Sequence, residues 1–270
     1  MPELPEVETT CRGIRPHLLG QTITAVTLRQ PKLRWPIPAE LMTAVGQAIL
    51  GVSRRGKYLL IETAAGTILI HLGMSGSLRL AEAHQQAAKH DHVDIALGNG
   101  KILRLHDPRR FGAVLWWTGP IEDHPLLNKL GPEPLEAGFV DQHLWQLSGG
   151  RKQAVKAFIM NGHIVVGVGN IYASESLFRA GILPHRQAGR VSRQRYLHLS
   201  RVIREVLTEA IAQGGTTLQD FTNSDGQPGY FAQELLVYGR EGQPCVACTA
   251  NIKMKVIGQR ASFYCPKCQT

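Results

Sequence analysis

Four cysteines near the C-terminal end constrain the fold of this chain more than any other sequence feature. Two residues separate Cys245 from Cys248, sixteen residues follow, and Cys265 and Cys268 repeat the two-residue spacing. Two such knuckles typically supply four thiolates to one tetrahedral Zn²⁺. Because sulfur fills all four positions and leaves none for water, we predict one structural zinc ion that stabilises a small hairpin. A redox-active dithiol pair is the alternative for the same cysteines.

The charge of the chain favours a polyanionic partner. Its 30 Lys and Arg residues exceed its 21 Asp and Glu residues, which gives a formal net charge of +9. Nucleic acid leads the candidates, because binding to phosphates releases condensed counterions. Charge alone leaves open the alternative of a protein that is merely soluble and cationic.

Length and hydropathy indicate a soluble protein of about two domains, since 270 residues exceed what one core usually organises. No apolar run approaches the roughly 20 residues of a membrane span. The acidic N-terminal segment is unlike a signal peptide. We therefore expect a cytoplasmic protein without a membrane partner.

Hydrophobic periodicity predicts one N-terminal helix followed by strands. Apolar residues recur at spacings of three and four from Leu4 to Leu18, which makes Cys11 a core residue of that helix. The hairpin signal Gly98-Asn99-Gly100 separates two of the runs that read as strands. These runs are Ile23–Leu28, Tyr58–Ile61, Thr67–Leu72, Val93–Leu97, Ile102–Leu105 and Ala113–Trp117. The first 115 or so residues therefore read as a β-sandwich that carries one helix.

The second half of the chain reads as helical. A proline-rich segment from Gly119 to Gly138 suits a linker between domains. Helical spacing follows at Asp141–Leu147, Lys152–Met160 and Ile171–Ala180, and the clearest stripe runs from Tyr196 to Ile211 before Gly214-Gly215. The segment Gly167-Val168-Gly169-Asn170 opens one of these helices, and it suits either a phosphate clamp at a helix N-terminus or a tight turn between helices.

The N-terminus carries a possible nucleophile. Removal of Met1 before the small residue Pro2 would leave a free secondary amine beside the carboxylate of Glu3. An α-amino group titrates far below a lysine, so more of it is the neutral nucleophile near pH 7. Its attack on a sugar C1′ would give an iminium that acidifies C2′ and promotes loss of the 3′ phosphate. The alternative is a proline without a chemical role.

Several motifs occur together and in order: Pro2–Thr9, Arg55–Leu59, His71–Gly76, Lys89–His92, Asp107–Gly112, Gly167–Tyr172 and the four cysteines. Together they resemble bacterial formamidopyrimidine-DNA glycosylase over essentially the whole chain. Leu4 and Val7 are similar to this branch, whereas the related endonuclease VIII branch typically has Gly at the position of Leu4.

The resemblance implies an α+β multidomain fold: an N-terminal catalytic β-sandwich domain with its helix (1–118), a linker (119–138), a helix-two-turn-helix DNA-binding domain (139–234) and a zinc finger (235–270). It also implies a monomeric bifunctional glycosylase and AP lyase. Such an enzyme removes 8-oxoguanine and formamidopyrimidines from double-stranded DNA and cuts abasic sites by β,δ-elimination. The stretch Thr217–Tyr230 resembles the loop that closes over the everted purine.

The resemblance also assigns roles to single residues. Pro2 becomes the nucleophile, Glu3 the acid that assists sugar-ring opening, Lys57 the lysine that supports β-elimination, and Arg260 the finger arginine of δ-elimination. The remaining matches are DNA contacts, with Met74, Arg109 and Phe111 filling the gap left by the everted base, and His71, His90, Arg151, Asn170 and Tyr238 contacting the DNA. Rival functions are an oxidised-pyrimidine enzyme of the endonuclease VIII type, a non-catalytic zinc-ribbon DNA binder, and a zinc ribbon of the topoisomerase or transcription type.

Overall fold

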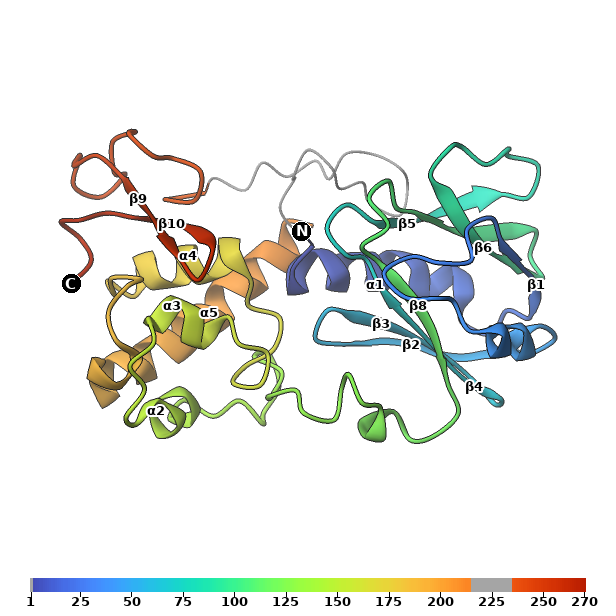
Figure 1. Cartoon of the computed structure of the whole chain (residues 1–270), viewed down its shortest axis with the longest axis horizontal. Helices are drawn as coiled ribbons and strands as arrows, with labels where there is room; N and C mark the ends of the chain where they lie inside the picture. Colours follow the sequence, from blue (N-terminus) through green and yellow to red (C-terminus); the bar gives the residue numbers. More distant parts are fainter. Residues whose placement is uncertain (1, 215–234) are drawn as a thin grey trace. The chain divides into compact units, whose positions relative to one another are not determined.

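The computed structural model describes residues 2–214 and 235–270 as two compact units. Residues 2–128 form most of the described part of unit 1, and residues 129–213 with 235–270 form unit 2. The expected purine-closing stretch 217–230 lies outside the described residues. Figure 1 gives the labels used below.

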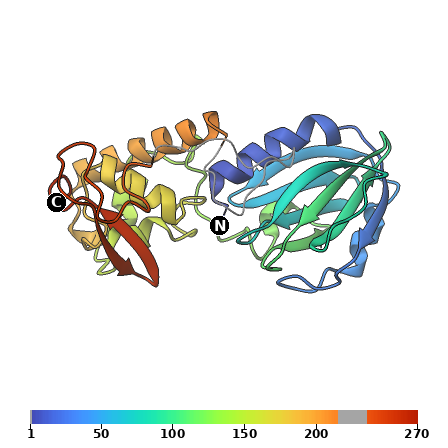
Figure 2. The ribbon, with the colours of Figure 1, turned by 90° about the horizontal axis from the view of Figure 1, so that it is seen from above.

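Helix α1 (Leu4–Leu18) confirms the predicted N-terminal helix. Its start is fixed by a capping box, in which the Glu6 side chain accepts the backbone N–H of Glu3 at 2.8 Å, and Pro5 occupies the first turn. The helix buries its apolar stripe, and Cys11 is only 1% exposed. It packs on strands β2 (Ile49–Arg55), β3 (Tyr58–Thr63) and β5 (Ser77–Glu82) (Figure 2).

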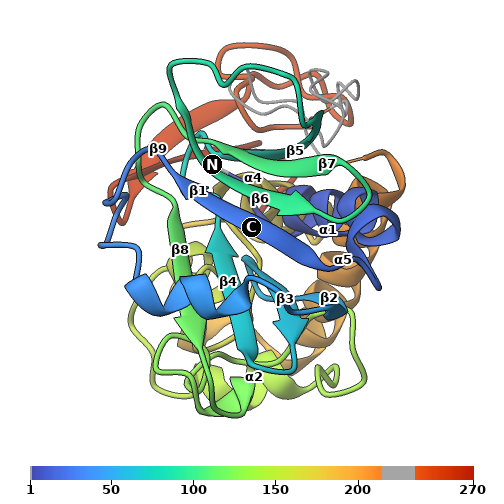
Figure 3. The same ribbon diagram turned by 90° about the vertical axis from the view of Figure 1, so that its right-hand side faces the viewer.

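Two four-stranded antiparallel sheets form the rest of unit 1 (Figure 3). One has the order β1 (Ile23–Leu28), β6 (Asp91–Leu97), β7 (Lys101–His106) and β5 (Ser77–Glu82); the other has β2 (Ile49–Arg55), β3 (Tyr58–Thr63), β4 (Gly66–His71) and β8 (Ala113–Trp117). The predicted β-sandwich is confirmed, and so is the hairpin at Gly98–Gly100, which joins β6 to β7. The prediction missed β2 and β5, whose polar and glycine residues interrupt the apolar signal.

One apolar core connects the helix with both sheets. Its members come from the buried stripe of α1 and from the inward-facing alternate residues of the strands, such as Ile61, Ile68 and Leu103. Each such side chain contributes about 1.5–3 kcal/mol when it leaves water. The short 3₁₀ turns η1 (Ala39–Ala44) and η2 (Ile121–Asp123) lie in the connecting segments.

Unit 2 consists of helices followed by a two-stranded hairpin. The helices are α2 (His143–Ser148), α3 (Val155–Ile159), α4 (Asn170–Arg179) and α5 (Arg193–Ala212), with the 3₁₀ turn η3 (Ala188–Arg190) before α5. Ser192 caps α5 by accepting the N–H of Arg195. The predicted helix Lys152–Met160 is too long. Ala154 instead pairs with Gln187 as an isolated β-bridge, and the N–H of Val155 bonds to the carbonyl of Arg186.

The hairpin joins β9 (Lys253–Ile257) to β10 (Arg260–Tyr264). Its two turn residues, Gly258 and Gln259, have φ values of 55° and 61°, as a tight hairpin turn requires. No helix in the described part of the chain is long and apolar enough to cross a membrane.

Candidate active site

The N-terminus of α1 and the turn between β2 and β3 lie at the same end of unit 1. Arg15, in the last turn of α1, donates to the carbonyl of Val52 on β2 at 2.7 Å. Glu8, about two turns closer to the start of the helix, accepts from Arg54 on β2 at 2.6 Å. Moving toward the start of α1 thus corresponds to moving toward the β2–β3 turn, which carries Lys57. Pro2 and Glu3 precede α1 and are both buried. The candidate nucleophile and the candidate lysine therefore share one end of the sandwich.

His71 connects this turn to a pocket. It ends β4, pairs across the sheet with Tyr58, and their rings lie 4.9 Å apart. Burial, the positive charge of Lys57 and that of Arg34 lower the pKa of His71 from about 6.5 to about 4. The imidazole is thus neutral near pH 7. Its Nδ1 accepts the N–H of Gly73 at 3.0 Å, which leaves the proton on Nε2 as a donor.

The pocket beside His71 has a volume of about 510 Å³. Its walls come from the segments 33–34, 71–74 and 110–111. Met74 and Phe111 both line it, and the Arg109 guanidinium stacks 5.0 Å from the centre of the Phe111 ring. Phe111 remains 45% exposed although it is a large apolar side chain. The three residues expected to fill a gap in DNA are therefore close together at an open surface.

The loop that carries Arg109 and Phe111 is held by Asp107. This carboxylate is fully buried and accepts the N–H groups of Arg110 at 3.1 Å and Gly112 at 2.8 Å. Burial raises the pKa of Asp107, and the hydrogen bonds oppose that rise. Gly73 packs against the same loop so closely that a Cβ there would lie 2.4 Å from the carbonyl carbon of Phe111.

His90 lies beside this loop in a group of three histidines. Its ring is 6.2 Å from that of His92 and 5.9 Å from that of His106. His92 bonds through Nε2 to the carbonyl of Asp107 at 3.0 Å, and His106 bonds to buried Asp91 at 2.8 Å. His90 is half-buried, and its two neighbouring imidazoles are each held by a hydrogen bond.

In unit 2 a buried lysine holds Asn170 and the finger hairpin together. Lys156 is 1% exposed, and its Nζ donates to Oδ1 of Asn170 at 2.6 Å, the carbonyl of Ala261 at 3.0 Å and Oγ of Ser262 at 2.9 Å. The Asn170 amide then donates to the hydroxyl of Tyr238 at 3.4 Å. Arg260 is exposed and adjoins the Ala261 anchor. The ammonium group of Lys156 thus links Asn170, and through it Tyr238, to the backbone beside Arg260.

A buried glutamate fixes Tyr238 from the other side. Glu175 of α4 accepts the backbone N–H groups of Leu236, Val237 and Tyr238 at 2.9, 3.0 and 2.9 Å. Sequence reasoning missed Glu175 and Lys156. The signal for Lys156 was a lysine inside the apolar run Ala154–Ile159, where an unpaired charge would be costly. Arg151 lies elsewhere in unit 2, in the exposed turn after α2.

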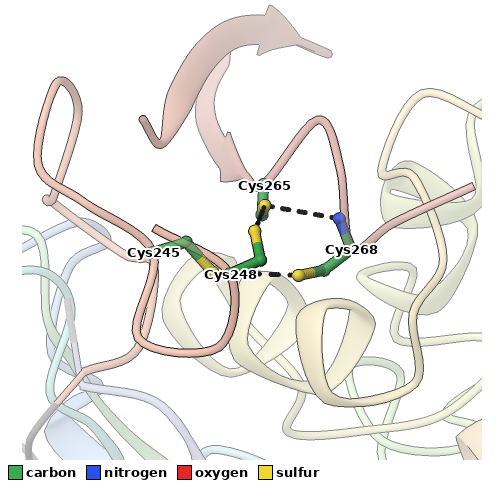
Figure 4. A group of neighbouring side chains, drawn as sticks. All are labelled: Cys245, Cys248, Cys265 and Cys268. Atoms are coloured by element: carbon green, nitrogen blue, oxygen red, sulfur yellow. Dashed lines mark hydrogen bonds between the residues drawn. The ribbon is translucent and has the colours of Figure 1, made fainter. Parts of the chain in front are cut away.

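The four cysteines form one cluster (Figure 4). Their sulfur atoms all lie within 4.8 Å of one another, and two of the separations are 3.9 and 3.4 Å. Tetrahedral Zn²⁺ with bonds of about 2.3 Å would separate its sulfur ligands by about 3.8 Å, so the cluster fits this ion. Backbone N–H groups of Ala247 and Cys268 also point to cysteine sulfurs at 3.4 Å, which suits thiolate ligands.

The fold and these residues define an α+β multidomain protein with a β-sandwich, a helical unit and a zinc finger. Family models match three consecutive segments: the formamidopyrimidine-DNA glycosylase N-terminal domain at residues 1–114, the formamidopyrimidine-DNA glycosylase H2TH domain at 130–222, and the zinc finger found in FPG and IleRS at 242–270. The chain belongs to the formamidopyrimidine-DNA glycosylase family, and its four cysteines are the ligands of one structural zinc ion.

Individual relatives agree over their full lengths. The chain is 61% identical to the formamidopyrimidine-DNA glycosylase of Syntrophotalea carbinolica and 60% identical to that of Pseudomonas entomophila, with 100% of each chain covered. The crystal structure of MutM (Fpg) from Thermus thermophilus superposes with a TM-score of 0.89 at 39% identity, covering 99% of this chain and 98% of that one. Lactococcus lactis Fpg in complex with abasic-site DNA gives a TM-score of 0.91 at 31% identity, with 99% of both chains covered.

Proposed function

We propose that this chain is a base-excision repair enzyme that removes oxidised purines from double-stranded DNA and then cuts the abasic strand. The observation that carries the proposal is the buried Pro2-Glu3 pair at the same end of the sandwich as Lys57. The names of the relatives support the substrate class. So do Lactococcus lactis Fpg structures with DNA containing Fapy-dG and with abasic-site DNA.

Pro2 is the proposed nucleophile, and it requires removal of Met1. The free amine attacks C1′, the N-glycosidic bond breaks, and the oxidised base leaves with the bonding pair and takes up the proton that the amine nitrogen loses. Glu3 protonates the ring oxygen as the sugar opens, which leaves an iminium between the Pro2 nitrogen and C1′. The iminium withdraws electrons, so C2′ loses a proton and the 3′ phosphate departs. The first elimination cuts the strand, and loss of the 5′ phosphate in a second elimination removes the opened sugar and leaves a one-nucleotide gap.

Lys57 and Arg260 assist these eliminations as cations near leaving phosphates. Lys57 lies on the turn beside His71, and its charge contributes to the low pKa of that imidazole. Neutral His71 would donate Nε2–H to a phosphate oxygen without changing its protonation state. Arg260 extends from the start of β10, next to a backbone that Lys156 holds.

Eversion of the damaged nucleotide leaves a gap in the stack, which costs a few kcal/mol if it stays empty. The exposed ring of Phe111 can wedge between bases, Met74 can adapt to an irregular gap, and Arg109 can hydrogen-bond the orphaned base. His90, Arg151, Asn170 and Tyr238 would contact the DNA backbone.

The test is borohydride trapping on a duplex with one 8-oxoguanine opposite cytosine, followed by peptide mapping. We expect a covalent adduct at Pro2 together with strand cleavage. The matched control is the same chain with a short N-terminal extension, which blocks the secondary amine and should give neither trap nor cut. An adduct at Lys57 would contradict the proposed nucleophile. Preferential cleavage of a thymine glycol duplex would contradict the purine preference, and binding without any cleavage would contradict catalysis.

A further inference from the structure

The positive charge of this chain is concentrated in one segment. Residues 142–204 contain ten Lys and Arg residues and one acid, Glu175, whereas the rest of the chain contains 20 basic and 20 acidic residues. The formal excess of +9 therefore equals the charge of these 63 residues of unit 2. Glu175 does not offset this charge at the surface, because it is buried against three backbone N–H groups.

Five of these ten basic side chains are engaged in contacts within unit 2. Lys156 is buried, Arg179 pairs with Glu209, Arg201 and Arg204 pair with Asp141, and Arg195 donates to two backbone carbonyls. Four others are exposed and have no carboxylate partner among the described residues: Arg151, Lys152, Arg190 and Arg193. Exposed cations without acids near them suit an anionic partner.

Three segments bring these four residues to one surface, which we call the Trp145 patch. The guanidinium of Arg193, at the start of α5, lies 5.4 Å from the ring centre of Trp145 on α2. The N–H of Gly189, next to Arg190, donates to the carbonyl of Arg151 at 2.9 Å. The Trp145 patch therefore consists of Trp145, Arg151, Lys152, Arg190 and Arg193.

The Trp145 patch has the features of a surface that binds phosphate. Trp145 is 41% exposed, so its ring and the Arg193 guanidinium over it can both be reached from solvent. A guanidinium over an indole face keeps N–H donors that can meet phosphate oxygens. The first turn of α5 carries Arg193 and Arg195 and no acid, so like charges lie at the positive end of the helix dipole. A bound anion would relieve that repulsion.

We propose that the Trp145 patch is a second DNA-contact surface, which binds backbone phosphates of the duplex flanking the damaged site. The inference rests on the proposed function, because Arg151 is itself an expected DNA contact and lies within the patch. The patch adds contacts that the reaction does not need, so it extends the length of duplex that the protein holds. Its contribution depends on salt and not on base sequence.

The experiment compares binding to duplexes of two lengths. Each contains a central uncleavable abasic analogue, and they span about one and about three helical turns of 10.5 base pairs. Wild type should bind the long duplex more tightly than the short one. R190A/R193A should lose about tenfold in affinity for the long duplex and nearly 2 units of the log–log salt slope, at about 0.9 per phosphate contact. Its affinity for the short duplex and its single-turnover cleavage of a short abasic duplex should stay within twofold of wild type.

Two further variants separate charge from geometry. R12A/K101A removes the same formal charge from unit 1 and should keep the wild-type length dependence. W145A should lose several-fold in long-duplex affinity, whereas W145F retains an aromatic face for Arg193 and should lose less.

The inference is overturned if R190A/R193A and R12A/K101A bind the long duplex equally well. It is also overturned if R190A/R193A weakens short and long duplexes equally and slows cleavage, since the patch would then belong to the site of reaction. Failure of the proposed function would be seen in a different assay, because wild type would then leave the short abasic duplex uncut. The dependence on duplex length is measured by binding to uncleavable duplexes, so it can be scored whether or not the protein cleaves.

Discussion

Replacing His71 by Asn should remove an acid-sensitive part of the stability of unit 1. Burial, Lys57 and Arg34 lower the pKa of this imidazole to about 4. The unfolded chain, with a pKa near 6.5, therefore binds more protons than the native state between those two values. The native state loses stability as pH falls through that window and keeps it above pH 6.5. A shift of this size makes the loss about 2 kcal/mol between pH 7 and pH 4.5.

The assay is urea unfolding at pH 7.0, 5.5 and 4.5. Trp145 is the one tryptophan of unit 2, so a W145F background restricts the fluorescence to unit 1. H71N keeps an acceptor for the N–H of Gly73 and does not titrate. Between pH 7 and pH 4.5 it should therefore lose about 2 kcal/mol less stability than its parent. H84N removes an exposed imidazole and should follow the parent. Equal acid sensitivity of parent and H71N would refute the conclusion that His71 is held neutral.

Four other predictions follow from the same contacts. K156M should destabilise unit 2 by about 3 kcal/mol in chemical unfolding, because a methionine fills the space but leaves three acceptors, among them buried Ser262, without their donor; unchanged stability would contradict the role of the ammonium. E175Q should weaken binding to abasic duplex about tenfold, because an amide accepts fewer of the N–H groups that fix Tyr238, and E205Q on the exposed face of α5 is its control. Chelation of zinc should abolish DNA binding while the β-structure of unit 1 stays folded by circular dichroism, and tight binding by the metal-free protein would contradict the role of the finger. G73A should destabilise unit 1 by at least about 2 kcal/mol, because Gly73 has a φ of 66° and a Cβ would clash with Phe111, whereas G100A in the open turn should cost less.

Local chemistry made much of this architecture predictable. The apolar stripe of α1, the hairpin glycines at 98 and 100 and the paired cysteines each specify a structure through neighbours in sequence. Strand β2 was missed because Gly51 and three polar residues dilute its apolar pattern, and its pairing with β3 is what makes it a strand. The start of α3 was misplaced for a similar reason, since the hydrogen bonds of residues 154 and 155 go to a segment more than 30 positions away.

The site residues likewise fall into a group that local motifs predict and a group that depends on distant contacts. Residues expected to contact DNA could be named from motifs, and the structure places several of them together, as with Met74, Arg109 and Phe111 at the pocket of unit 1. The roles of the groups that support them could not be assigned, because the partners of a buried Lys or Glu are supplied by the fold and not by neighbours in sequence. Lys156 reaches a strand more than 100 residues later, and Glu175 reaches a segment about 60 residues later. No local pattern encodes such pairs.

The residues that orient the expected DNA contacts all act through one physical effect. A donor that must meet a phosphate loses less free energy on binding if its orientation is already fixed. Four of the expected contacts have a partner that fixes them: Gly73 for His71, Lys156 for Asn170, Glu175 for Tyr238 through the backbone, and Asp107 for the loop of Phe111. The Lys, Glu and Asp partners are buried and hydrogen-bonded, so their charges hold geometry, while exposed cations such as Arg260 remain at the surface. The chain therefore separates the buried charges that position the expected contacts from the exposed charges that we expect to touch DNA, and the lysine at position 156, inside an apolar run, is the sequence signal of the first kind.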